Sequence, residues 1–158
     1  MIVISDTSAI TNLYQIGLLK ILQGLYGEIV ISPGVRRELY SISDQREVIE
    51  PLDWIVTRYP ENQLLVAELL EDLDLGEAES IALAIELEAS LLIIDEALGR
   101  KRALSYDVKI TGVLGILILA RQQNFIDSVG PHIEQLRSIG FRLKQSLVDT
   151  VLKKLGEK

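Results

Sequence analysis

Short apolar runs alternate with longer segments of helical periodicity along most of the chain. The short runs predict buried strands at 2–5, 28–31, 54–57, 90–94 and 109–111. Apolar residues at helical spacing predict helices at 9–26 (two short ones), 33–42, 60–70, 77–87, 97–106, 112–121, 128–138 and 145–154. The alternation of the two kinds of segment predicts an α/β fold, with a mostly parallel sheet that helices cover on both faces.

Local signals refine the boundaries of these elements. Ser32 and Pro33 combine a capping hydroxyl with a proline at the first helical position, so a helix is expected to begin there. Pro60 is expected to open a later helix, and Gly76 to separate that helix from the next one. Residues 44–51 are polar and predict a connection between elements.

Composition favours a single globular domain over residues 1–158. Hydrophobic residues make up 48% of the chain, and the longest apolar helical segment, 113–120, is too short for a membrane span and predicts a buried helix. The chain has no cysteine, which excludes disulfides, zinc–thiolate sites and thiol nucleophiles. With no signal-peptide pattern at its start, we expect a cytoplasmic protein.

The formal net charge of −7 argues at first sight against a nucleic-acid partner, because lysine and arginine supply the affinity for phosphates. The argument loses its force if several carboxylates converge on divalent cations, since the ions then set the local field. The distribution of the acids therefore matters more than their sum.

Two acids follow two of the predicted strands. Asp6 comes directly after the run 2–5, and Asp95 directly after the run 91–94. Parallel strands place both carboxylates at one edge of the sheet, where open α/β sheets bind ligands. The alternative for Asp6 is a helix cap, because an aspartate there can accept hydrogen bonds from free backbone N–H groups.

Glu77 lies on the apolar face of its predicted helix. On a helical wheel Ile81 and Ile85 fall within about 80° of it, whereas Glu79 falls on the opposite side with Glu86. Burying a carboxylate there is costly unless it is paired, hydrogen-bonded or bound to a metal. The alternative is a first-turn glutamate that turns to solvent.

Glu38 borders the inward face of its helix, beside Val35 and Leu39, or else forms an exposed ion pair. Four converging carboxylates at positions 6, 38, 77 and 95 would repel one another unless cations filled the space between them. Oxygen ligands favour Mg²⁺ or Mn²⁺, and a chain with one histidine and no cysteine does not suit zinc.

These acids carry a family resemblance. Ser5–Ser8, Val35–Leu39, Gly76–Glu79 and Ile93–Asp95 resemble, in order and spacing, the four acidic motifs of PIN-domain nucleases, which include the VapC toxins of toxin–antitoxin pairs. The resemblance covers roughly the first 130 residues. The helices at 128–155 resemble a less characterised PIN-like branch, in which they pack on the domain or form an oligomer interface.

The resemblance implies a three-layer sandwich and a Mg²⁺- or Mn²⁺-dependent endoribonuclease. One cation would lower the pKa of a bound water that attacks the phosphodiester, and a second would stabilise the departing oxygen. Single-stranded or structured RNA would be the substrate, and an antitoxin and a second copy of the chain the partners. The implied metal ligands are Asp6, Glu38, Glu77 and Asp95, with Ser8 and Glu79 in supporting roles.

Basic residues near these acids are candidates for binding substrate phosphates. Arg100, Lys101 and Arg102 follow Asp95, and Arg36 and Arg37 are weaker candidates near the same edge. Each could equally be a solvated helix charge.

The sequence departs from the family pattern at three points. Glu77 stands where the family often has aspartate, Ile93 stands where it often has threonine, and no further acid follows at 97–99. A degenerate site is therefore an alternative, in a non-catalytic interaction protein. Leu143, Leu147 and Val151, spaced by four, could build the surface of such a protein. A receiver domain fits less well, because it would need a second acid beside Asp6.

Overall fold

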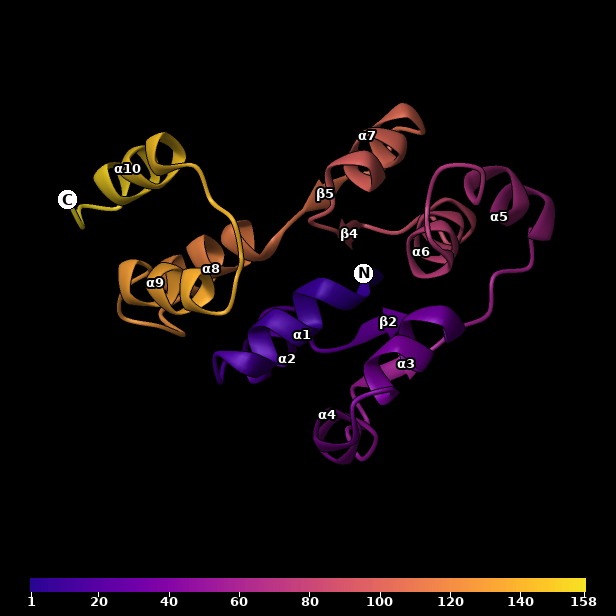
Figure 1. Ribbon diagram of the computed structural model, residues 1–158, viewed down its shortest axis with the longest axis horizontal. Helices are drawn as coiled ribbons and strands as arrows, with labels where there is room; N and C mark the ends of the chain where they lie inside the picture. Colours follow the sequence, from indigo (N-terminus) through magenta and orange to yellow (C-terminus); the bar gives the residue numbers. More distant parts are fainter.

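The computed structural model describes residues 1–158 and has a five-stranded sheet. The strands are β1 (Val3–Ser5), β2 (Ile29–Ile31), β3 (Ile55–Thr57), β4 (Leu91–Ile93) and β5 (Ile110–Thr111). Strands β2, β4 and β5 are labelled among the helices in Figure 1. All four pairings are parallel, and the strand order is β3-β2-β1-β4-β5. The predicted parallel sheet is confirmed, and β1 is its central strand.

Ten helices surround the sheet. They are α1 (Thr7–Gln15), α2 (Lys20–Tyr26), α3 (Pro33–Tyr40), α4 (Ser43–Ile49), α5 (Gln63–Leu69), α6 (Leu75–Glu86), α7 (Ala97–Ser105), α8 (Val113–Gln122), α9 (Gly130–Ser138) and α10 (Gln145–Lys154). None of them combines the length and the apolar character that crossing a bilayer requires.

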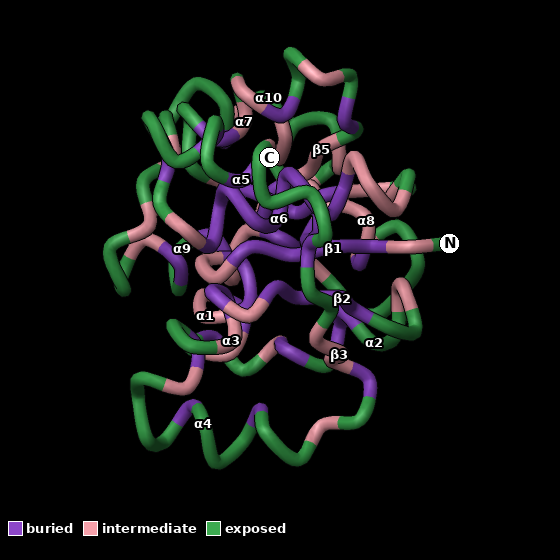
Figure 2. The backbone as a smooth tube through the Cα atoms, turned by 90° about the vertical axis from the view of Figure 1, so that its right-hand side faces the viewer, coloured by how far each residue is buried: buried purple, intermediate pink, exposed green.

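The side chains of the strands divide the interior into two apolar cores. Ile4, Val30 and Leu92 pack on one face with α5, α6 and α7. Val3, Ile29 and Ile93 alternate with them and pack on the other face with α1, α2, α3, α8, α9 and α10. This period of two is that of a strand covered on both sides. The result is a three-layer α/β sandwich, with β1 and β2 in its buried middle (Figure 2).

One predicted connection is a helix. Residues 44–51 were expected to be irregular because they are polar, but α4 occupies most of this stretch. Only Gln45 and Ile49, four residues apart, are buried in it. The Gln45 side-chain amide donates to the carbonyl of Leu39 over 2.9 Å. So narrow a buried stripe left no apolar pattern in the sequence.

Two predicted helix boundaries are also wrong. Helix α5 begins at Gln63, where the Asn62 side chain accepts a hydrogen bond from the Leu65 amide, and Pro60 lies before it. Gly76 does not separate two helices. It is the second residue of α6, which Asp74 caps.

The register of the sheet sets up its carboxyl edge. Ser5 pairs with Ile93, and the Asp6 amide continues the ladder by donating to the Ile93 carbonyl over 2.9 Å. Asp6 and Asp95 therefore leave the sheet at the same edge, one residue out of step with each other.

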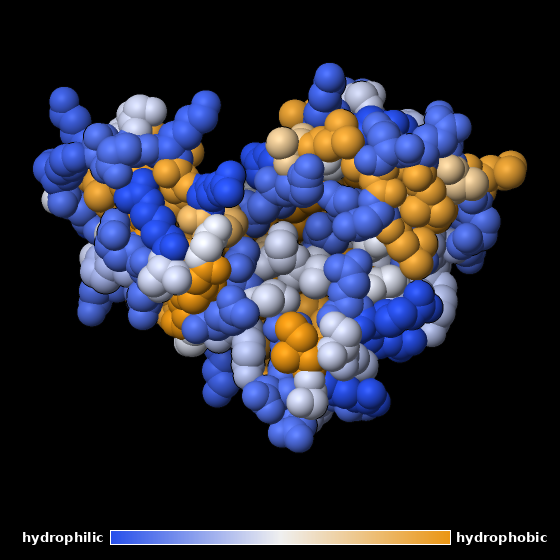
Figure 3. All heavy atoms as spheres, in the orientation of Figure 1, coloured by the Kyte–Doolittle hydropathy of each residue, from blue (hydrophilic) through white to orange (hydrophobic).

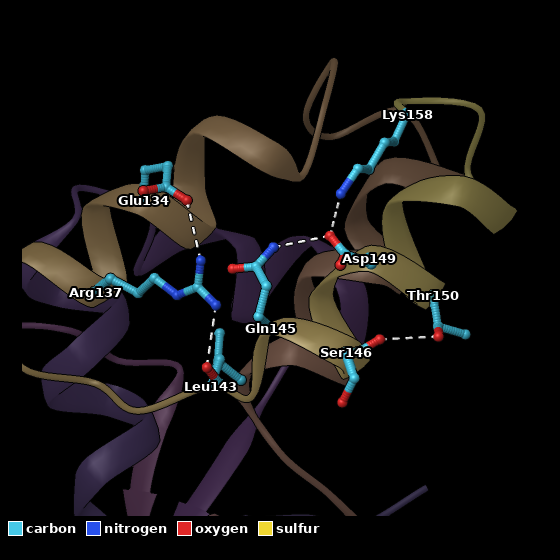
Figure 4. Close-up of polar contacts among 8 residues, drawn as sticks. All are labelled: Glu134, Arg137, Leu143, Gln145, Ser146, Asp149, Thr150 and Lys158. Atoms are coloured by element: carbon cyan, nitrogen blue, oxygen red, sulfur yellow. Dashed lines mark hydrogen bonds and ion pairs between the residues drawn. The ribbon is translucent and has the colours of Figure 1, made fainter.

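The last two helices pack against the core that includes α8, through Val129, Ile133, Leu136 and Val148. Arg137 holds the extended segment between them, because its guanidinium donates to the Leu143 carbonyl over 3.0 Å (Figure 4).

The end of the chain is also anchored. Glu157 accepts hydrogen bonds from the amides of Val129 and Gly130, each at 2.9 Å, and pairs with Arg121 at 3.0 Å. This arrangement, the Glu157 clamp, ties the tail after α10 to the start of α9 and the end of α8.

Candidate acidic site

A cavity of about 460 Å³ opens at the carboxyl edge of the sheet, beside the end of β1. Five carboxylates line it, and no lysine or arginine does. They belong to Asp6, Glu38, Asp74, Glu77 and Glu96. We refer to this space as the acidic cavity.

Asp6 and Glu77 are the buried acids of the cavity, each with 6% of its surface exposed. Asp6 occupies the cap position of α1, but its side chain makes no capping hydrogen bond. Burial raises the pKa of Asp6 to about 7, against the Thr7 amide, which lowers it. Repulsion from Asp74, Glu38 and Asp95 adds to the rise.

Glu38 reaches the same space from α3. Its Oε1 and the Oδ1 of Asp6 lie 2.8 and 3.4 Å from the point where a Cβ atom on Gly76 would stand. The two carboxylates therefore converge over Gly76, and a methyl group there would displace the end of the Glu38 side chain. Burial and the nearby Asp74 raise the pKa of Glu38, and the Thr7 hydroxyl opposes them.

Glu77 and Asp74 form a capping box at the N-terminus of α6. The Glu77 amide donates to the Asp74 side chain over 2.8 Å, and the Asp74 amide donates back to Oε1 of Glu77 over 3.1 Å. The other oxygen, Oε2, is buried and has no hydrogen-bond partner. Burial, with repulsion from Asp74 and Asp6, raises the pKa of Glu77 to about 7.

Asp95 lines a neighbouring cavity of about 500 Å³ instead. Both of its oxygens lie 3.2 Å from the Val113 amide at the start of α8. Arg100 lies beside it and donates to the Ile94 carbonyl over 2.8 Å. Burial raises the pKa of Asp95, and the Val113 amide and Arg100 oppose that rise.

This second cavity runs between the α7 side of the molecule and α10. Arg142 and Leu147 line it together with Asp95. Figure 3 shows the molecular surface hollowed between these two sides. The structure thus gathers Asp6, Glu38 and Glu77 into one cavity and leaves Asp95 at its border.

Glu79 lies in a different place from the one the helical wheel predicts. The helical wheel predicts that Glu79 faces outward, and this prediction is wrong. Glu79 is buried, with only 8% of its surface exposed, and its Oε1 accepts a hydrogen bond from the Gly34 amide over 2.7 Å. Helix α3 covers that side of α6, which is buried over almost its whole circumference. Glu79 joins the two helices and does not line the acidic cavity.

The remaining candidate residues are spread over several surfaces. Ser8 lines the acidic cavity. Arg102 forms an ion pair with Asp72 at 2.7 Å, and Lys101 is exposed. Among the candidate phosphate contacts after Asp95, Arg100 alone lies in a cavity that a predicted site acid also lines.

Two acids of the cavity were not among the predicted site residues. Asp74 had a sequence signal, since an aspartate three residues before Glu77 is the pattern of a capping box. Glu96 has the sequence signal of an acid at the start of a helix, since it directly precedes the helix predicted at 97–106. It does cap α7, where its Oε1 accepts from the Leu98 amide over 3.3 Å, and it also lines the acidic cavity.

A family model described as a PIN domain (DUF3368) matches residues 2–157. The chain belongs to the PIN-domain family. The match extends through α9 and α10, well beyond the part of the chain that carries the acidic motifs. Members of this family are generally nucleases, so this PIN domain has the fold of a nuclease. No curated protein matches the chain.

The donor set of this PIN domain suits a hard divalent cation. All the charged side chains that line the acidic cavity are carboxylates, and one oxygen, Oε2 of Glu77, is buried without a partner. No three acidic or histidine side chains are close enough to share one ion as they stand. The chemistry of the donors fits the ion, but a complete shell requires some of these side chains to rotate.

Proposed function

We propose that this PIN domain is a Mg²⁺- or Mn²⁺-dependent endoribonuclease that cleaves single-stranded or structured RNA. One observation carries the proposal. Asp6 and Glu77, whose pKa values are raised to about 7, share a cavity with Glu38, and no basic side chain lines it. Such concentrated negative charge is costly to a folded chain, and an external cation would remove the cost.

Asp6, Glu38 and Glu77 are the residues that would hold the ion, with Asp95 at the border of the site. When bound, a divalent cation supplies Lewis-acid chemistry, which polarises the scissile phosphate and makes water a better nucleophile at neutral pH. The chain itself supplies the positions of the ligands. The capping box with Asp74 fixes one oxygen of Glu77, and Gly76 leaves room for Glu38.

Arg100 is the nearest candidate for a substrate phosphate. Its guanidinium donates to the Ile94 carbonyl and lies near enough to Asp95 to lower the pKa of that residue, so it presents a positive charge at the border of the acidic site. The acids lie in a recess at the sheet edge, which a splayed single strand or a loop enters more readily than a duplex does.

The decisive experiment compares the wild-type protein with Asp6→Asn on a labelled single-stranded RNA. We expect the wild type to cleave the RNA with Mn²⁺ and not in EDTA. In the variant the cleavage rate should fall by at least about 100-fold. Loss of a group that only supports a metal ligand costs about 10- to 100-fold, and loss of a ligand itself should cost more. Lys154→Ala, an exposed change in α10, is the matched control and should cleave normally. Equal cleavage by Asp6→Asn would attribute the activity to a contaminating nuclease.

We further propose that the protein is the toxin of a toxin–antitoxin pair, with an antitoxin protein and a second copy of the chain as partners. Expression of the wild-type chain alone should slow growth, and expression of Asp6→Asn to the same level should not. Growth curves with matched immunoblots measure this difference. Normal growth of cells that contain active ribonuclease would remove the toxin role and leave the enzyme.

A second candidate function is that of a non-catalytic PIN-like interaction protein. The observation that favours it is the separation of Asp95 from the other acids, together with the lack of a preformed cation site. The cleavage assay separates the two candidates. Absence of Mn²⁺-dependent cleavage by pure, folded wild-type protein would favour the interaction protein.

A further inference from the structure

A third cavity adjoins the acidic one on the outer side of α3. It has a volume of about 440 Å³, and its lining includes three arginines, Arg36, Arg37 and Arg46. Ser41 lines both this cavity and the acidic one, and it follows Glu38 by one helical turn. The two cavities therefore meet at the end of α3, with opposite charges on their walls.

Two tyrosines accompany the arginines. The guanidinium of Arg36 donates to the Tyr59 hydroxyl over 3.1 Å and lies 6.0 Å from the centre of its ring. The guanidinium of Arg46 lies 5.1 Å from the centre of the Tyr40 ring. We call Arg36, Arg37, Tyr40, Arg46 and Tyr59 the arginine–tyrosine patch.

The residues of the patch have different amounts of free surface. Arg46 pairs with Glu50 at 2.9 Å, and the Tyr40 ring packs partly on the core, so these two are already engaged. Arg37 is exposed and forms no ion pair. Tyr59 is 64% exposed, and the Arg36 guanidinium donates to its hydroxyl, beside a ring that stays open to solvent. The groups free to bind a ligand are thus the charges of Arg36 and Arg37 and the ring of Tyr59.

We propose that the arginine–tyrosine patch binds the single-stranded RNA on one side of the cleavage point, with backbone phosphates on Arg36 and Arg37 and a base stacked on Tyr59. This inference rests on the proposed function, because it takes the acidic cavity as the place of hydrolysis. Arginine pairs with phosphate through two parallel hydrogen bonds, and an exposed ring offers a stacking surface for any base.

The surroundings of the patch favour RNA over an acidic peptide. The chain has a net charge of −7, so three arginines around one cavity make a local excess of positive charge. An acidic peptide on the patch would extend toward the five carboxylates next door and be repelled by them. An RNA strand that extends from the patch into the acidic cavity would meet bound cations in that cavity. Its bases could also stack on Tyr59, whereas a carboxylate side chain cannot stack.

The topology also directs a strand from one cavity to the other. Tyr59 follows β3 and Asp6 follows β1, so both leave parallel strands at the same edge of one sheet. Helix α3 lies between them, with Glu38 toward the acidic cavity and Arg36 and Arg37 toward the patch.

The test measures binding of a fluorescein-labelled single-stranded RNA of about 10 nucleotides, a length within the range that such surfaces cover, by anisotropy in Ca²⁺, a hard cation that carboxylates bind. Gel electrophoresis of the same samples checks that the RNA is intact. The double variant R36A/R37A should weaken binding at least about tenfold and lower the slope of log Kd against log salt by about 1.4, for two lost phosphate contacts. The double variant K153A/K154A loses the same charge from the exposed end of α10 and should change Kd less than about twofold.

A second variant separates stacking from charge. Tyr59→Leu keeps the charge, and its site is exposed, so the fold should be preserved. It should weaken RNA binding about fivefold to tenfold without changing the salt slope, and should leave binding of an abasic oligomer unchanged. Thermal unfolding of each variant confirms that the chain is folded.

Three results would overturn the inference: wild-type affinity in R36A/R37A, an equal loss in K153A/K154A, or a loss in R36A/R37A confined to a poly-glutamate peptide. The last result would assign the patch to a protein partner. If the wild type cleaves RNA with Mn²⁺ and R36A/R37A binds RNA normally, the proposed nuclease function is kept and the role of the patch is rejected. RNA binding that depends on the arginines, without any cleavage, would reject the nuclease and keep the patch.

Discussion

Glu77 and Glu157 are both glutamates with little access to solvent, one in the first turn of α6 and the other after α10. Both oxygens of Glu157 are used, by the amides of Val129 and Gly130 and by Arg121. Glu77 has one oxygen held by the Asp74 amide and one that is buried without a partner, and its neighbours are other acids. The chain compensates the charge of Glu157 internally and leaves the charge of Glu77 uncompensated.

The pKa values of the two regions follow this difference. Burial alone would raise the pKa of Glu157, but the amides of Gly130 and Val129 and the charge of Arg121 hold it below its ordinary value. In the acidic cavity burial is reinforced by repulsion, and the pKa values of Asp6 and Glu77 rise. The comparison separates a carboxylate that stabilises the fold from carboxylates that destabilise it and are suited to bind an ion.

The largest expected effect is on the stability of the metal-free protein. Because the pKa of Asp6 is raised to about 7, the folded state holds a proton there that the unfolded state has released, so stability falls as pH rises from about 4 to about 7. Asp6→Asn removes this cost and should raise the free energy of unfolding at pH 8 by about 1 to 4 kcal/mol. Thermal unfolding in EDTA between pH 4 and pH 8 measures the difference, which should vanish at the acid end.

The control for this measurement is Asp53→Asn, an exposed change that should leave stability within about 0.5 kcal/mol of the wild type. Added Mn²⁺ should reverse the ranking at about 1,000 times its dissociation constant, where an ion bound only by the folded state stabilises it by about 4.1 kcal/mol. A metal-free Asp6→Asn less stable than the wild type at pH 8 would show that the cavity acids are compensated after all. Loss of cleavage in the same variant would then no longer distinguish a ligand from a structural residue.

The sequence predicted those features of the site that depend on period and topology. Asp6 and Asp95 were placed at one sheet edge because parallel strands align their carboxyl ends, and Glu77 was placed inward because Ile81 and Ile85 share its face. These inferences need only the alignment of parallel strands and the periodicity of the α-helix. They do not depend on which other helix lies nearby.

The sequence failed where a neighbouring helix or a single backbone group decides the outcome. Glu79 was expected to face outward because a helical wheel assumes one buried side, whereas α6 is covered by the sheet on one side and by α3 on the other. The Val113 amide captures Asp95, and no pattern in the sequence marks that contact. The spacing of apolar residues along the chain indicates which face of its helix or strand a residue occupies. It does not indicate which other element packs against that face.

The smallest expected effect tests the other half of the comparison, the Glu157 clamp. Glu157→Gln keeps the size of the side chain and removes its charge, so we expect a loss of about 1 kcal/mol at pH 7 and a fall in Tm of about 2 to 4 °C. Because the pKa of Glu157 is lowered in the folded state, the loss should be complete above the unfolded pKa of about 4.3 and should disappear as pH falls below it. This pH dependence is opposite in sign to that of Asp6→Asn.

Glu134→Gln supplies the matched control for the clamp. Glu134 also forms an ion pair, with Arg137 at 3.3 Å, but its side chain is 72% exposed, and the pair should contribute less than about 0.5 kcal/mol. Chemical denaturation of both variants at pH 7 and at pH 4 measures the two effects side by side. Equal losses in the two variants would mean that the backbone amides of Val129 and Gly130 add nothing to the pairing with Arg121. The contrast between the two regions would then reduce to the presence or absence of an arginine.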